Sequence, residues 1–388
     1  MGAGPDDEVP IVSTELYHSD FDAFVKVRAR APSPRARYAS SSRRAPSPGT
    51  GWREDLTFRG PGNLEILAHP LLADAPFSRA SPPLLFARVQ ALGDAYEEYG
   101  FVILRNHGVS ESLIARNLES AKAFFALPTE EKMKYHLEGQ GGARGYTAFG
   151  VETAVGSAHH DLKEFWHLGR DLPAGHRYEA CMPPNVVVSE GDFQGATREM
   201  FAALDALGGR VLEALAVHLG QPRAYFADKV DEGNSILRVI HYPPLVKPGE
   251  DAGAALAKAG HVRAAAHEDI NLITLLLGAD EGGLELLRRD GRWMEVHPPP
   301  GCVTCNIGDM LQRLSNHRLP STTHRVVNPP RERAHLARFS TPFFLHPNPD
   351  FVIETLETCV TPDRPNRYPE PITSDAYLQE RLRAIKLK

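Results

Sequence analysis

The stretch AAHEDINLITLLLG, residues 265–278, joins a His-x-Asp pair directly to an apolar run of strand-forming residues. On a β-strand, residues i and i+2 face the same side of the sheet. We therefore expect the side chains of His267 and Asp269 to point together into a β core, while Glu268 points away. An imidazole and a carboxylate on one face are two ligands of a candidate metal site, which then needs a third ligand from elsewhere in the fold.

The third ligand is predicted to be His324, which lies 324 − 267 = 57 residues after His267 and precedes the apolar pair Val326-Val327. Two histidines and one carboxylate on one face of an octahedron are the ligand set of non-haem Fe(II) oxygenases, which leaves three positions open. Zinc is the main alternative, although a catalytic zinc ion leaves only about one position open. For either histidine alone, a hydrogen-bonded place in the core is the simpler interpretation.

The His-x-Asp pattern occurs at two other places in the sequence. His18 and Asp20 lie beside a basic N-terminal segment, and His159 and Asp161 lie between a glycine-rich loop and the run LKEFWHLG. Neither pair enters the strand-rich half of the chain, so neither is expected to bind the metal.

Short apolar runs separated by turn residues follow one another after Asn234. They cover residues 236–242, 272–277, 284–287, 293–296, 303–307, 323–327 and 338–345. Strands at this spacing indicate a sandwich or a jelly roll. Helical spacing is found instead from residue 83 to 100 and over residues 112–125, 197–219 and 375–385. The sequence therefore predicts a mixed α/β (α+β) fold with a supporting N-terminal helical layer.

We expect three parts in the chain. Residues 1–55 include the run RARAPSPRARYASSSRRAPSPG, which has too little apolar surface to offset the entropy of ordering, so this extension should be disordered and dispensable. Residues 83–230 should form the helical region, and residues 231–388 should form the β core with a C-terminal helix.

Composition excludes several classes of protein. The 388 residues are 42% hydrophobic and 24% charged, with a formal net charge of −6, which fits a globular protein and gives no reason to expect a nucleic-acid or membrane-surface partner. No apolar stretch approaches the ~18 residues that span a bilayer. Four scattered cysteines favour a reducing compartment, so we expect a cytoplasmic protein. The oligomeric state stays open, and a monomer is compatible with the sequence.

A second i, i+2 pair, Arg338 and Ser340, follows His324 by 338 − 324 = 14 residues. A buried arginine is costly unless it meets an anion, and a guanidinium beside a hydroxyl suits one carboxylate. The alternative is an arginine that pairs with Asp or Glu at the end of a strand.

Several motifs in this order resemble the isopenicillin N synthase-like family of Fe(II)/2-oxoglutarate oxygenases. The resemblance covers roughly residues 83 to 382. Its motifs are YGFVILRNHGV (99–109), DLKEFW (161–166), ILRVIHYPP (236–244), AAHEDINLITLLLG (265–278), NIGDMLQRLSNHRLPSTTHRVV (306–327) and ARFSTPFFLHPNPDF (337–351).

The resemblance implies a distorted jelly roll, or double-stranded β-helix, with Fe(II) inside. It also implies that 2-oxoglutarate and O2 are consumed, that succinate and CO2 are released, and that a small-molecule substrate is hydroxylated or desaturated. The residues carried over by position are the iron ligands His267, Asp269 and His324, the 2-oxoglutarate contacts Arg338 and Ser340, and the pocket tyrosine Tyr242.

Some features depart from the family pattern or leave alternatives open. Ile240 stands where many members have Asn, and Asn271 stands where Gly is common. The Arg-x-Ser pair also occurs in relatives that do not use 2-oxoglutarate, so an Fe(II) oxidase of the same fold is an alternative. A non-catalytic binding protein is a further alternative, against which the intact ligand set argues.

Two other groups of residues have weaker interpretations. Cys302-x-x-Cys305 resembles a zinc or redox motif but is better explained by core packing. Arg144 and Tyr146 lie in a glycine-rich loop that borders the substrate pocket in relatives, which makes them candidate substrate contacts.

Overall fold

The structure is a computed structural model that describes residues 11–13, 82–139, 142–152, 160–189, 191–246, 262–277 and 281–384. The basic stretch 26–53, expected to be disordered, lies outside the described residues. The chain is a mixed α/β protein whose sheets are almost entirely antiparallel.

Eight strands form the larger sheet, in the order β1-β2-β10-β7-β12-β5-β4-β3. Their bounds are β1 Ile11–Ser13, β2 Phe101–Arg105, β10 Val303–Ile307, β7 Ile273–Leu277, β12 Arg338–Leu345, β5 Ile236–Tyr242, β4 Glu164–Gly169 and β3 Gly145–Thr147. Only β1 and β2 run parallel. The inner strands β2, β10 and β7 read as nearly continuous apolar runs because both faces of the sheet are covered.

A smaller antiparallel sheet faces the larger one and contains β6 (Ala264–His267), β11 (His324–Val326), β8 (Leu284–Leu287) and β9 (Trp293–Glu295), in that order. A two-stranded ribbon, β13 (Val352–Ile353) with β14 (Ile372–Thr373), lies near the C-terminus. The seven strands expected after Asn234 are all found, with ends that differ by at most one residue.

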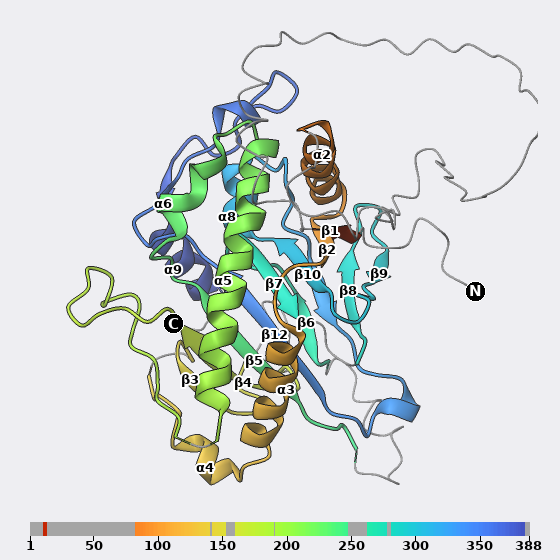
Figure 1. Ribbon diagram of the computed structural model, residues 1–388, viewed down its shortest axis with the longest axis vertical. Helices are drawn as coiled ribbons and strands as arrows, with labels where there is room; N and C mark the ends of the chain where they lie inside the picture. The colour runs from red at the N-terminus through yellow and green to blue at the C-terminus, as the bar shows by residue number, and fades with distance from the viewer. Residues whose placement is uncertain are drawn as a thin grey trace, which may run out of the picture.

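Helices cover the outer face of the larger sheet, where the long helix α5 crosses the strands and contacts β12, β4, β5 and β7 (Figure 1). The α-helices are α2 (Pro82–Tyr99), α3 (Glu111–Phe125), α4 (Thr129–Met133), α5 (Phe193–His218), α6 (Ala227–Val230), α8 (Asp309–Leu314) and α9 (Ser374–Ala384). Short 3-10 turns lie at η3 (Arg223–Phe226), η4 (Arg331–Arg333) and η5 (Glu357–Cys359). Helices α2 and α3 both pack against α5.

Two expectations about the N-terminal half need correction. Residues 83–230 are not helical throughout, because besides the short apolar run that forms β2 they give β3 and β4 to the larger sheet. Within the extension expected to be disordered, Ile11–Ser13 pairs with Ile103–Arg105 as an edge strand. The strand β4 was missed because all six of its residues are buried, so it lacks the alternation that marks a half-exposed strand.

The described residues form two large apolar cores. The main core lies between the larger sheet and the helices, and it includes the buried face of α5. A smaller core lies between the two sheets and contains Phe101, Leu284 and Val326. Cys305 belongs to the first core and Cys302 to the second, and both are free thiols, which fits the packing interpretation. No helix in the described part of the chain is long and apolar enough to cross a membrane.

Candidate metal centre

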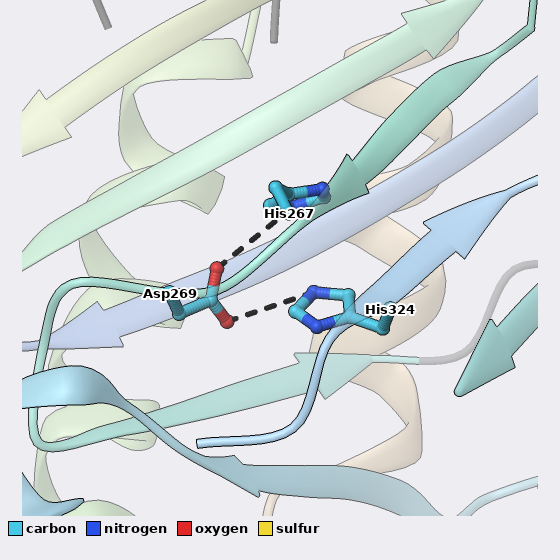
Figure 2. A group of neighbouring side chains, drawn as sticks. All are labelled: His267, Asp269 and His324. Carbon is cyan, nitrogen blue, oxygen red and sulfur yellow. Dashed lines mark ion pairs between the residues drawn. The ribbon is translucent and has the colours of Figure 1, made fainter. Parts of the chain in front are cut away.

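Three side chains from the smaller sheet and an adjoining loop converge between the two sheets. His267 ends β6, and His324 lies directly opposite it at the start of β11. The Nε2 atoms of His267 and His324 lie 4.0 Å and 3.8 Å from the carboxylate oxygens of Asp269 (Figure 2). The three ligand atoms all lie within 4.8 Å of one another, which is close enough for one metal ion.

Asp269 does not lie on the strand that the i, i+2 argument assumed. β6 ends at His267, and Asp269 belongs to the loop that crosses to β7 in the larger sheet. The two side chains still converge because this loop turns back toward the cavity. Its carbonyl groups accept hydrogen bonds from the first turn of α8, with Asp309 N 2.7 Å from Asp269 O and Met310 N 3.1 Å from Asn271 O.

Both histidines present Nε2 to the centre because the other ring nitrogen is bonded elsewhere. His267 Nδ1 lies 2.7 Å from the carbonyl oxygen of Ala265, and His324 Nδ1 lies 3.0 Å from that of Thr322. A carbonyl can only accept, so each Nδ1 donates a proton and each Nε2 carries the lone pair that a metal needs.

The carboxylate is oriented by two buried polar side chains that the sequence analysis did not identify. Thr274 Oγ1 and Asn306 Nδ2 both donate to Asp269 Oδ2, at 2.6 Å and 2.8 Å. Asn271, the departure from the family glycine, donates to Thr274 Oγ1 at 2.9 Å. The available signal was the presence of polar residues inside two buried strands, Thr274 in β7 and Asn306 in β10.

The protonation states favour a cation. Burial alone would raise the pKa of Asp269, but the two histidines and the donors Thr274 and Asn306 hold that pKa below its ordinary value. Burial and the neighbouring His324 lower the pKa of His267. The centre therefore offers one charged carboxylate and a neutral imidazole near neutral pH, and this donor set fits a divalent metal ion.

A cavity between the two sheets connects these ligands with Arg338, Ser340 and Tyr242. It is lined by Phe101, Lys163, Arg238, Ile240, Tyr242, Ala264, His267, Asp269, Thr274, Leu276, Leu284, Asn306, His324, Val326, Arg338, Ser340, Pro342 and Phe344. The neighbouring strands β12 and β5 set the order along one wall, because Arg338 pairs with Tyr242 and Ser340 with Ile240.

Arg338 is a buried cation, with only 3% of its surface exposed. Its Nε donates to the Glu281 carbonyl oxygen at 3.0 Å and its Nη1 to Ser340 Oγ at 3.2 Å. Among the described residues, no carboxylate forms an ion pair with it, since the Glu281 carboxylate binds Arg333. Burial lowers the pKa of Arg338, so this end of the cavity favours an anion.

A second arginine strengthens the positive charge at this end. Arg263 is fully buried, and its guanidinium lies 5.9 Å from the centre of the Tyr242 ring, while that of Arg338 lies 5.1 Å from it. The tyrosine ring thus lies near two guanidinium groups. Their mutual repulsion raises the free energy of the empty pocket, so a bound anion is favoured.

The remaining candidates from the sequence lie elsewhere. Tyr146 donates a hydrogen bond to Glu164 inside the main core, and Arg144 is 2% exposed against Gly169, so neither lines the cavity. His18, Asp20 and His159 fall outside the described residues.

Comparison with known proteins agrees with this geometry. Residues 76–190 match the family model described as non-haem dioxygenase in morphine synthesis N-terminal, and residues 233–347 match the 2OG-Fe(II) oxygenase superfamily. A 2-oxoglutarate-Fe(II) type oxidoreductase, hxnY, from Emericella nidulans is 31% identical over 335 residues, which cover 83% of this chain and 93% of the relative. The chain belongs to the 2-oxoglutarate/Fe(II)-dependent oxygenases.

Solved structures of oxygenases have the same fold. One is a 2OG-Fe(II) oxygenase family protein from Caulobacter crescentus, with 53% identity, a TM-score of 0.70, and coverage of 78% of this chain and 95% of that one. Another is a full-length Neurospora crassa protein in complex with α-ketoglutarate, with 30% identity, a TM-score of 0.70, and coverage of 79% and 93%. The protein is therefore an oxidoreductase that uses Fe(II), 2-oxoglutarate and O2.

Proposed function

We propose that His267, Asp269 and His324 hold the ferrous ion of this oxygenase, and that Arg338, Ser340 and Tyr242 hold the far carboxylate of 2-oxoglutarate. The observation that carries the proposal is the single cavity that joins both groups. Its three ligand atoms suit one metal ion, and its buried arginine pairs with no carboxylate of the described residues. A dicarboxylate keto acid supplies the anion that this pocket needs.

When bound, Fe(II) supplies the redox chemistry that couples O2 and 2-oxoglutarate, giving succinate and CO2, to oxidation of the substrate. The residues of the chain bind and orient the reactants. The carbonyl groups of Ala265 and Thr322 fix the histidine tautomers, and Thr274 and Asn306 fix the carboxylate plane.

We propose a small-molecule substrate that is hydroxylated or desaturated. The supporting facts are the small cavity and the neighbouring proteins, since one structure of the Neurospora crassa protein contains thymine and another contains 5-formyluracil. We also propose that the two facing sheets are the two sides of a distorted jelly roll, because their antiparallel strands enclose the ligand set. A cytoplasmic location and a monomeric state stay predictions.

Titration of 2-oxoglutarate into the anaerobic Fe(II) protein tests the site. Chelation of iron by the keto acid should produce a visible charge-transfer band, which His324→Ala should abolish. A metabolite screen for stimulated succinate release under O2 then identifies the substrate. If the wild-type Fe(II) protein forms no band and releases no succinate with any substrate, the assignment of these six residues is wrong.

A further inference from the structure

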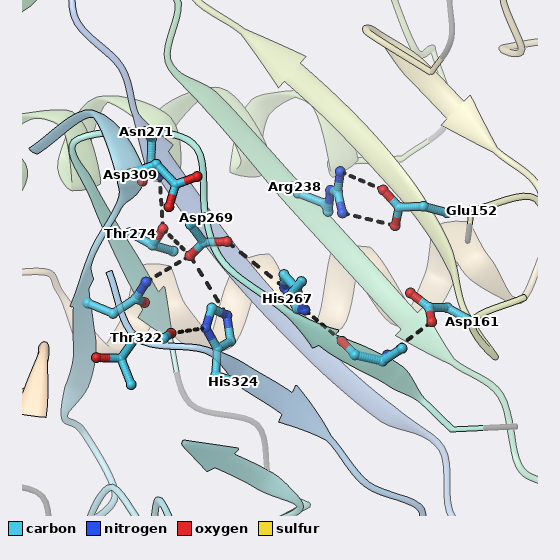
Figure 3. Close-up of polar contacts among 12 residues, drawn as sticks. Glu152, Asp161, Arg238, His267, Asp269, Asn271, Thr274, Asp309, Thr322 and His324 are labelled. Carbon is cyan, nitrogen blue, oxygen red and sulfur yellow. Dashed lines mark hydrogen bonds and ion pairs between the residues drawn. The ribbon is translucent and has the colours of Figure 1, made fainter. Parts of the chain in front are cut away.

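The Ala265 backbone connects the iron ligand His267 to a carboxylate outside the ligand set. Among the strands that the structure describes, β6 is at the edge of the smaller sheet and pairs with β11 on one side only. On that strand, Ala265 N–H donates to Asp161 Oδ1 at 3.0 Å, and the Ala265 carbonyl accepts from His267 Nδ1 at 2.7 Å (Figure 3). The orientation of the His267 ring thus depends on a backbone that Asp161 anchors.

Asp161 is itself fixed by a chain of buried ion pairs. Its Oδ2 lies 2.9 Å from Lys163 Nζ, which also lies 2.6 Å from Glu152 Oε2. Both oxygens of Glu152 accept from the guanidinium of Arg238 at 3.2 Å. Figure 3 shows the Glu152–Arg238 pair on the Asp161 side of His267.

This series of ion pairs is balanced in charge, because it contains two cations and two carboxylates. The side chains of Asp161 and Lys163 are only 5% and 6% exposed. A buried carboxylate held by an ammonium group and a backbone N–H has no low-energy alternative rotamer, because leaving either partner exposes an unpaired buried charge. Asp161 is therefore a rigid support.

We infer that Asp161, held by Lys163 and the Glu152–Arg238 pair, is a positioning residue for the iron ligand His267. Asp161 belongs to the His159/Asp161 pair, one of the two His-x-Asp pairs to which the sequence analysis assigned no function. It acts through the backbone of Ala265, which keeps His267 Nδ1 protonated and Nε2 directed at the metal. This inference rests on the proposed iron site.

The simpler alternative is that these ion pairs only stabilise the fold. The two roles differ in what they change. A structural ion pair alters the free energy of unfolding alone, whereas a positioning residue also alters the affinity and the ligand field of the metal. Substitution of residues that support a metal ligand typically lowers metal affinity about 10–100-fold.

The test is a titration of Co(II) alone into the metal-free, full-length protein, following the visible d–d absorption and the unfolding temperature. Asp161→Ala should weaken Co(II) binding by about 10-fold or more and change the absorption bands. Asp161→Asn keeps an oxygen for Ala265 N–H but loses the attraction of Lys163, so its affinity should fall between wild type and Asp161→Ala. If Asp161→Ala does not fold, Asp161→Asn tests the inference by itself.

Glu164→Gln is the matched control, because Glu164, three residues after Asp161, forms a similarly buried ion pair with Lys132. It should lower stability without changing Co(II) affinity or absorption. Wild-type Co(II) affinity and absorption in both Asp161 variants would overturn the inference, as would an equal loss in Glu164→Gln. If the wild-type protein binds no Co(II), or if His267→Ala binds it normally, the proposed iron site fails instead.

Discussion

His267 and His324 lie directly opposite each other on neighbouring antiparallel strands, with their ring centroids 4.4 Å apart. Two residues that are 57 positions apart in the sequence are thus brought together by one backbone pairing. The pairing sets the spacing of the two backbones, and the bonds from Nδ1 to the carbonyl groups of Ala265 and Thr322 orient the rings.

Loss of any one ligand should remove the metal and leave the fold. His267→Ala, Asp269→Ala or His324→Ala leaves two protein ligands, which are too few to hold a labile ferrous ion. Each variant should lose turnover while its circular dichroism stays that of wild type. Iron content, measured after anaerobic loading, should fall from one per chain to near zero. A variant that keeps normal iron content and rate would exclude that residue as a ligand.

Arg338→Leu should weaken 2-oxoglutarate binding more than any other single change at the anchor. It removes the partner of a desolvated carboxylate, an effect on the order of 2–5 kcal/mol. That corresponds to at least roughly 30-fold, because about 1.4 kcal/mol is a factor of ten. Arg338→Lys should retain only part of the affinity, because an ammonium group keeps the charge but cannot form the bidentate hydrogen bonds of a guanidinium.

Ser340→Ala should weaken 2-oxoglutarate binding less, by about the 0.5–1.5 kcal/mol of one net hydrogen bond. The KM for 2-oxoglutarate should therefore rise in the order Ser340→Ala, Arg338→Lys, Arg338→Leu, with iron content unchanged. A different order, or loss of iron in these variants, would contradict the assigned contacts.

Thr274→Val should loosen the metal while preserving the shape of the core. The substitution removes one of two donors to Asp269 Oδ2, and such supporting bonds are typically worth about 10–100-fold in metal affinity or activity. Thr341→Val is the control, because Thr341 is a buried strand threonine that accepts a hydrogen bond from Asn117. Anaerobic Fe(II) competition titrations should separate the two variants, and equal affinities would show that Thr274 does not support the ligand.

The sequence predicted the strands and the proposed ligand set more completely than the residues that support them. His267, His324, Arg338 and Ser340 could be proposed because strand periodicity and family motifs preserve their spacing. Asp269 was proposed on the assumption that it shares a strand with His267, whereas it lies in the loop after β6.

Residues such as Asp161 and Asn306 could not be predicted, because each acts across a contact between segments far apart in sequence. Local periodicity carries no information about such contacts. The same limit applies to Tyr146, which the glycine-rich loop placed near the substrate and which packs in the main core.

Gly208→Ala and Gly209→Ala should have opposite effects on stability. A Cβ on Gly208 would lie 2.3 Å from the Leu345 side chain, which is fully buried in β12, whereas Gly209 has open space. Overpacking typically costs ~1–3 kcal/mol, and Gly→Ala at an unobstructed helix position gains ~0.5–1 kcal/mol. Urea denaturation measures both. If Gly208→Ala is as stable as wild type, the close approach of α5 to the sheet is not needed.

Deletion of residues 1–13 should lower the unfolding temperature, contrary to what composition alone suggested for the extension. The deletion removes β1 and exposes the edge of β2. Each net backbone hydrogen bond lost should lower the free energy of unfolding by ~0.5–1.5 kcal/mol. Deletion of residues 1–8, which stops before β1, should leave the unfolding temperature unchanged. Equal unfolding temperatures for the two deletions would mean that the β1–β2 pairing adds no stability.

The register between β12 and β5 limits how this pocket can evolve. A side chain on a strand returns to the same face only at every second residue, so a slip in register would move the anchoring group by ~7 Å. A keto acid that is longer by one methylene needs a far smaller adjustment. Relatives that accept longer or shorter cosubstrates should therefore change the side chains at the positions of Arg338 and Ser340 and keep the strand pairing. Insertions and deletions should be rare in β12 and frequent in the loops beyond its ends.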